Sequence, residues 1–140
     1  MKAAILANLG LPDPPTGSVV VADDINPIVD SAATTEPAAG TTDPLVVYFS
    51  ESLRDDGTTN LIADNGPVGF ITSSRGVVDG DFSITVSEDG RSASVAPIGG
   101  NWSSGETVTV DMDTVDDAEG NQGSDNDTGD ADNTHTFTIP

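Results

Sequence analysis

The carboxylates near the C-terminus are the residues whose types and spacing could do chemistry. Nine acidic side chains lie within the 22 residues from Asp111 to Asp132, and no Lys or Arg follows Arg91. Like charges at contact distance repel by about 1 kcal/mol per pair in bulk water, so the segment is either splayed and solvated or gathered by a cation. Calcium takes roughly 6–8 oxygen ligands from flexible loops. The ligands expected for a calcium ion are Asp113, Asp116, Asp117 and Asn121.

The solvated loop and the calcium site both stay open, and the solvated loop is the simpler expectation. The acids do not have EF-hand spacing: Asp125 and Asp127 begin such a loop, but its twelfth position is Thr136 instead of Glu. Asp117 and Asn121 also have a local interpretation. Asp, Asn and Gly tolerate left-handed geometry and bond to their own backbone at corners. A structural corner is therefore expected first, and metal ligation second.

Catalytic arrangements find less support in the sequence. Asp127-Thr128-Gly129 matches the aspartic-protease triplet, but that chemistry needs two carboxylates sharing a proton, and there is no second triplet. His135 is the only histidine, and no G-x-S-x-G elbow accompanies it, so a packed or rim position is expected for it. A glycosidase would need one partly buried acid beside a second carboxylate, whereas these acids fall in expected loops. The chain is expected not to be an enzyme.

Composition narrows the classes of protein further. The 140 residues carry a formal net charge of -20 with a sequence pI near 4.1, which disfavours binding to phosphate backbones. No apolar run approaches the roughly 18 residues of a membrane-spanning helix. With no Cys there is no disulfide framework and no thiolate zinc site. We therefore expect no nucleic-acid or membrane partner, and no cofactor unless calcium binds.

The elements that must position these acids are short strands. Phe82, Ile84 and Val86 alternate with polar residues before the turn Ser87-Glu88-Asp89-Gly90, which predicts a hairpin returning through residues 93–95. Leu45–Phe49 is a continuous apolar run, typical of a strand buried on both faces. Residues 31–44 suit an edge or loop. Further expected strands are Ser18–Ala22, Thr107–Met112, Thr134–Ile139 and, more weakly, Val68–Ile71.

Six or seven short strands at this spacing predict an all-β sandwich, with no helical periodicity beyond the N-terminus. Trp102, the single Trp, is expected to plug one end of the sandwich, because a large aromatic side chain buries well there. The residues expected to share one core are Phe49, Phe82, Ile84, Val86, Val108, Val110 and Phe137.

From about Ile25 to Pro140 the order of these signals resembles the bacterial Ig-like domains of surface-layer proteins, adhesins and virion proteins. The segments that carry the resemblance are Pro37-Ala38-Ala39-Gly40, Phe49-Ser50-Glu51-Ser52-Leu53, the hairpin at Ser87, Trp102 with residues 105–110, and Val115-Asp116-Asp117-Ala118-Glu119-Gly120-Asn121. The resemblance implies an Ig-like β-sandwich of about seven short antiparallel strands and a role in display, spacing or adhesion. Residues 1–24 and the acidic insert between Asn121 and Thr134 lie outside the family pattern.

Residues 1–24 are expected to form an arm and linker before the domain of residues 25–140. The apolar run from Ala3 to Ala7 is too short for a secretory signal, and a short helix ending at Gly10 fits it better. A lone helix of this length is marginal in water. The arm residues expected to bury against another chain are Ile5, Leu6 and Leu9.

Two classes of function follow. The first is a phage capsid decoration or cement protein in the virion, attached through its arm to the major capsid protein or to copies of itself as a homo-oligomer. The second is an Ig-like module of a secreted adhesin, surface layer or extracellular filament, at the cell surface and stabilised by calcium. The second class requires an export signal or tandem copies, and the sequence contains neither; the first class is therefore favoured.

Overall fold

Short strands make up nearly all the regular structure of this computed structural model, which describes residues 24–55, 59–60, 66–124 and 133–140. One 3-10 turn, η1 (Met112–Thr114), is the exception within these ranges. The strands are β1 (Val29–Thr35), β2 (Leu45–Phe49), β3 (Arg54–Asp55), β4 (Thr59–Asn60), β5 (Ile71–Ser73), β6 (Phe82–Val86), β7 (Ser92–Pro97), β8 (Thr107–Asp111), β9 (Val115–Asp116) and β10 (Thr134–Thr138).

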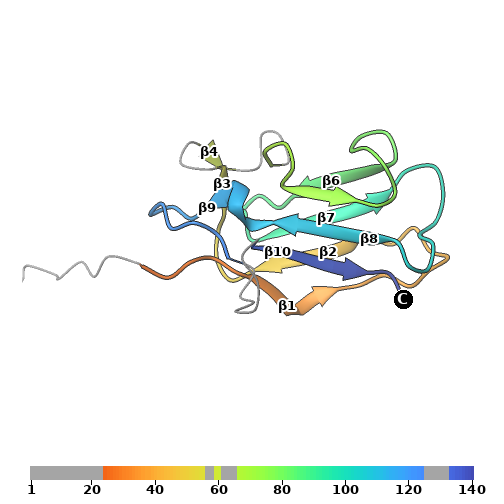
Figure 1. The fold of residues 1–140 in the computed structure, drawn as a ribbon, viewed down its shortest axis with the longest axis horizontal. Coiled ribbons are helices and arrows are strands. Elements are labelled where there is room, and N and C mark those ends of the chain that lie inside the picture. Colours follow the sequence, from red (N-terminus) through yellow and green to blue (C-terminus); the bar gives the residue numbers. More distant parts are fainter. Residues whose placement is uncertain (1–23, 56–58, 61–65, 125–132) are drawn as a thin grey trace, which may run out of the picture.

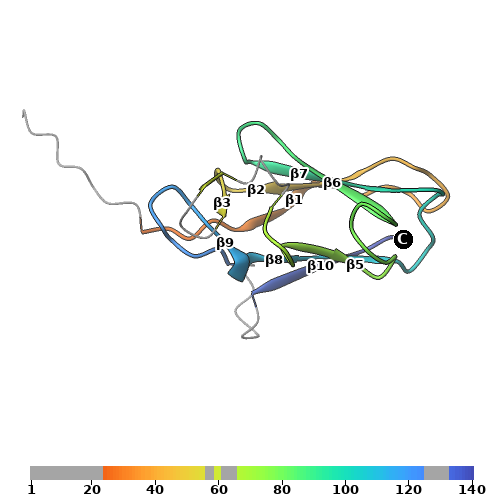
Figure 2. The same ribbon diagram turned by 90° about the horizontal axis from the view of Figure 1, so that it is seen from above.

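Two antiparallel sheets face each other as layers (Figures 1 and 2). One sheet has the strand order β1-β2-β7-β6 and the other has the order β10-β8-β5. A small third sheet, β4-β3-β9, lies at one end of the molecule. The predicted all-β sandwich is confirmed, and its two main sheets contain seven strands among the described residues.

The core lies between the two layers, because side chains alternate faces along each strand. In β6, Phe82, Ile84 and Val86 are buried whereas Ser83 and Thr85 are more exposed. All seven residues expected to share a core are buried in one apolar cluster. The largest side chains that this cluster adds to the expectation are Leu45, Leu53, Phe70, Trp102, Met112 and Ile139.

Two strand predictions need correction. Leu45–Phe49 is a strand with the expected bounds, but Val46 is half-buried and Tyr48 is 40% exposed, so it is not buried on both faces. A two-layer sandwich covers only one face of each sheet. The strand expected from Val68 begins instead at Ile71, because Gly69 turns the chain there with a φ of 91°. The strand expected over Ser18–Ala22 lies outside the described residues.

Trp102 closes one end of the sandwich, as expected. It is 2% exposed, and its indole Nε1 donates a hydrogen bond of 2.8 Å to the Asp43 carbonyl. We call this end, formed by residues 36–44 and 98–106, the Trp102 end. The opposite end carries β3, β4, β9 and the turn that follows β9 (Figure 1); we call it the acidic end.

Candidate functional site

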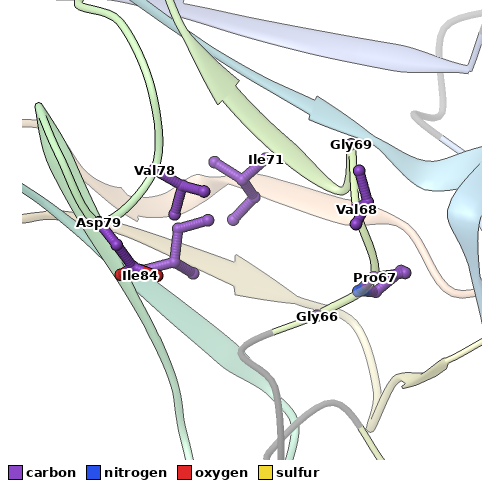
Figure 3. Close-up of a pocket in the computed structure, with 8 residues that line it drawn as sticks. All are labelled: Gly66, Pro67, Val68, Gly69, Ile71, Val78, Asp79 and Ile84. Carbon is purple, nitrogen blue, oxygen red and sulfur yellow. The ribbon is translucent and has the colours of Figure 1, made fainter.

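A hollow of about 240 Å³ opens between the edge strands β5 and β6. Figure 3 shows the side chains of Ile71, Val78 and Ile84 converging in it from β5, from the β5–β6 connection and from β6. The hollow is lined by Gly66, Pro67, Val68, Gly69, Ile71, Val78, Asp79 and Ile84. Its surroundings are apolar and exposed: Val68 is fully exposed, Val77 is 66% exposed and Val78 is 47% exposed.

A tight corner follows β9 at the acidic end. The Asp117 carboxylate accepts hydrogen bonds from the backbone N–H groups of Glu119 (2.8 Å) and Asn121 (2.7 Å) and from the Asn121 side-chain amide (2.7 Å). Gly120 completes the turn with a φ of 90°, a conformation that favours glycine. The structural corner expected from Asp117 and Asn121 is confirmed.

Asp117 is an ionised carboxylate inside the protein, being only 1% exposed. Burial by itself raises the pKa of Asp117. The hydrogen bonds from the Asn121 side chain and from the backbone N–H groups of the turn outweigh that effect and hold the pKa below its ordinary value. The corner therefore fixes a negative charge with dipoles alone, and Asp117 has no ion-pair partner among the described residues.

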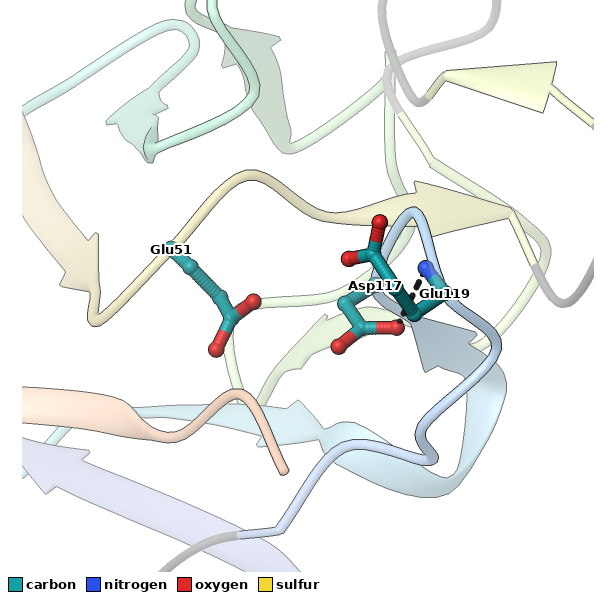
Figure 4. Close-up of side chains that lie close together, drawn as sticks. All are labelled: Glu51, Asp117 and Glu119. Atoms are coloured by element: carbon teal, nitrogen blue, oxygen red, sulfur yellow. Dashed lines mark hydrogen bonds between the residues drawn. The ribbon is translucent and has the colours of Figure 1, made fainter. Parts of the chain in front are cut away.

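Two further carboxylates approach Asp117. Glu51 comes from the connection between β2 and β3, and Glu119 comes from the turn itself. One oxygen of each of the three lies within 4.8 Å of the others, and Figure 4 shows the groups side by side. We call Glu51, Asp117 and Glu119 the acidic corner. Hard oxygen donors in this arrangement are ligands that suit calcium.

Asp116 adds a buried oxygen to the same end of the molecule. Its side chain is 5% exposed, and its Oδ1 has no hydrogen-bond partner among the residues that the structure describes. An unsatisfied buried acceptor costs about 1–3 kcal/mol. Asp116 lies opposite Arg54 in the β9–β3 pairing.

The four sequence-predicted ligands take different positions. Asp117 belongs to the acidic corner, Asn121 bonds to it, and Asp116 is its buried neighbour in sequence. Asp113 is exposed instead, and its carboxylate accepts a 2.8 Å hydrogen bond from the Asn133 amide. Sequence reasoning missed Glu51, because only the pairing of β3 with β9 brings the end of β2 beside the corner.

Other predicted groups are also placed. His135 is half-buried, with its ring 4.6 Å from the Phe137 ring, and so occupies a rim position. The arm residues Ile5, Leu6 and Leu9 and the triplet at Asp127 lie outside the described residues. Within the described ranges, no helix has the length and apolar character needed to cross a bilayer.

Comparison with family models, with curated proteins and with solved structures gives no match to this chain.

Proposed function

We propose that this chain is a non-enzymatic structural module of the bacterial Ig-like type that decorates a virion. It is a phage capsid decoration or cement protein, attached through its N-terminal arm to the major capsid protein or to copies of itself. The all-β sandwich with its strand-linking corner at Asp117 supports the Ig-like part of this proposal. The arm supports the assembly part.

The observation that carries the proposal is the place where the chain enters the sandwich. Pro27 is buried, and Ile28 bridges to Ser124 at the acidic end. Residues 24–26 before them are exposed, with Ile25 at 68%, and they lead away from both sheets (Figures 1 and 2). An arm joined there leaves both sheet faces and the Trp102 end available for display.

The arm itself has the composition of an anchor. Ile5, Leu6 and Leu9 are apolar side chains within residues 1–12, where Lys2 is the single charged side chain. Burial of each of the three contributes roughly 1.5–3 kcal/mol, which a lone short helix in water does not gain. Burial against a partner in the assembly supplies that stabilisation.

The test is incorporation into the parent particle. Deletion of residues 1–15, or replacement of Ile5, Leu6 and Leu9 by Ser, leaves the sandwich folded by circular dichroism and abolishes incorporation, measured on purified particles. A matched control replaces Ala3, Ala4 and Ala7 by Ser and keeps the three large side chains. Normal incorporation of the deleted chain contradicts the proposal.

A second candidate function has a separate observation in its favour. The convergence of Glu51, Asp117 and Glu119 suits an Ig-like module of a secreted adhesin, surface layer or extracellular filament, in which calcium stiffens the loops. Tandem copies or an export signal in the gene, together with stabilisation specific to calcium, favour this candidate over the virion protein.

A further inference from the structure

The hollow between β5 and β6 has the size and lining of a socket for aliphatic side chains. At about 240 Å³ it exceeds an apolar cavity of roughly 150 Å³ that takes up one benzene molecule. Ile71 and Ile84 form its floor, and Val78 projects into it (Figure 3). Exposed Val68 and Val77 widen the apolar surface beside it, and such patches mark binding sites when they are contiguous.

We propose that, in the free molecule, this hollow holds the apolar side chains of the chain's own N-terminal arm, Ile5, Leu6 and Leu9. The inference goes beyond the proposed attachment to an assembly, because it concerns the protein before it attaches. The arm is stored on its own domain and released when the assembly offers a larger apolar site.

The length of chain before Asp24 allows this docking. Leu9 and Asp24 are fifteen steps apart along the chain, and an extended chain spans at most about 3.3–3.6 Å per residue, or roughly 50 Å. The sandwich is smaller than that, since a domain of about 100 residues has a radius of gyration near 13 Å. Pro12, Pro14 and Pro15 favour an extended path over this distance.

Charge favours the same contact. Residues 1–12 contain the only Lys of the chain and no Asp or Glu, whereas all 24 acids and three Arg lie after them. Residues 1–12, whose one charged side chain is positive, are therefore attracted to the strongly negative body that carries the hollow. Asp79 lies on the lining and is exposed, so its carboxylate adds negative charge at the hollow itself.

The arm of the same molecule is a better occupant than the arm of a second copy. Two bodies of net charge -20 repel each other, and that repulsion opposes exchange of arms in solution. A tethered arm also has an effective concentration of about millimolar without any approach of a second molecule.

The absence of Cys from the chain permits a direct test by disulfide formation in the full-length protein. Leu6→Cys is combined with Val78→Cys in the hollow or, as control, with Tyr48→Cys on the outer face of β2, where exposure is similar at 40% against 47%. At low micromolar protein under mild oxidation, the hollow pair forms an intramolecular disulfide at least about tenfold faster, measured by intact mass and non-reducing gel. Equal rates for the two pairs overturn the inference, and so does a disulfide-linked dimer as the main product.

Thiol labelling gives a second measurement that does not depend on disulfide geometry. Replacement of Ile5, Leu6 and Leu9 by Ser speeds labelling of Val78→Cys by about tenfold and leaves Tyr48→Cys unchanged, since docking of the arm protects only the hollow. Replacement of Ala3, Ala4 and Ala7 by Ser is the matched control. An unchanged rate at Val78→Cys means that the hollow is open or covered by something other than the arm, and overturns the inference. Labelling of the free protein tests the docking of the arm in the hollow, and incorporation into particles tests the proposed attachment. Either proposal can therefore fail while the other holds.

Discussion

Charged side chains are stabilised differently at the two ends of the sandwich. At the Trp102 end, the Arg75 guanidinium lies 5.8 Å from the Trp102 ring centroid and 3.1 Å from the Glu106 carboxylate, and it donates to the Asp81 and Asn101 carbonyls. At the acidic end, Asp117 is held by N–H dipoles, and Glu51 and Glu119 bring two more carboxylates beside it.

The difference indicates which end is available for a ligand. Arg75 and Glu106 are 14% and 16% exposed in their side chains and balance each other, so the Trp102 end is complete from within. The acidic corner concentrates negative charge that a cation would stabilise. A structural role is therefore expected for the Trp102 end, and the acidic end is where binding of a cation is to be tested.

The largest expected effect is at the Trp102 end. Trp102→Ala removes a side chain that is 2% exposed and lowers the free energy of unfolding by about 3–5 kcal/mol, because the truncation leaves a cavity in the core at that end. Urea unfolding measures the change. Tyr48→Ala, at an exposed position of β2, is the control and costs less than half as much. A loss below about 1 kcal/mol for Trp102→Ala contradicts its role as a plug.

The corner at Asp117 gives the next largest effect. Asp117→Ala leaves two backbone N–H groups and the Asn121 amide without their acceptor, and the free energy of unfolding falls by about 2–3 kcal/mol. Glu88→Ala, at the exposed tip of the β6–β7 turn, removes an acid without this network and changes stability by about 0.5 kcal/mol or less. Equal effects of the two substitutions would show that Asp117 acts only through net charge.

Local patterns in the sequence were sufficient to predict part of the fold and part of the acidic corner. The alternation of apolar and polar residues predicted β6, and the turn at Ser87–Gly90 predicted β7. Both patterns depend only on residues close together in the sequence. The Asp117–Asn121 corner was equally local. Glu51 was not predictable, since its approach to Asp117 depends on pairing between β3 and β9, which lie far apart in sequence. The half-exposed face of β2 was missed because a continuous apolar run has no alternation to show which face points outward.

Acid pH should reduce the difference in the free energy of unfolding between the wild-type protein and the neutral variant Asp117→Asn. Since hydrogen bonding lowers the folded-state pKa of Asp117 below its ordinary value of 3.8, its contribution is fully present above that pH and is lost as the pH falls through the folded pKa. Wild type should exceed Asp117→Asn by about 1–2 kcal/mol at pH 7, and the gap should close below pH 3.8. Urea unfolding of both proteins from pH 7 to pH 2.5 measures it, and comparison of the pair cancels the general titration of the other acids. A gap that persists unchanged at pH 2.5 is inconsistent with an ionised Asp117.

The smallest expected effect decides whether the acidic corner binds calcium. An ion that binds only the folded state contributes about 1.4 kcal/mol at a tenfold excess over its dissociation constant, which is a shift of a few degrees in the melting temperature of a domain of this size. Screening of the net charge by any divalent salt also stabilises the fold, so calcium must be compared with magnesium at matched ionic strength. Calcium should raise the melting temperature further, because magnesium demands tight octahedral geometry and sheds water reluctantly.

Glu51→Gln removes one of the three converging carboxylates and should abolish the difference between the two salts, whereas Glu88→Gln should preserve it. Identical melting curves of the wild-type protein in calcium and magnesium would leave the acidic corner as a solvated structural turn, and would return both ends of the sandwich to a purely structural role.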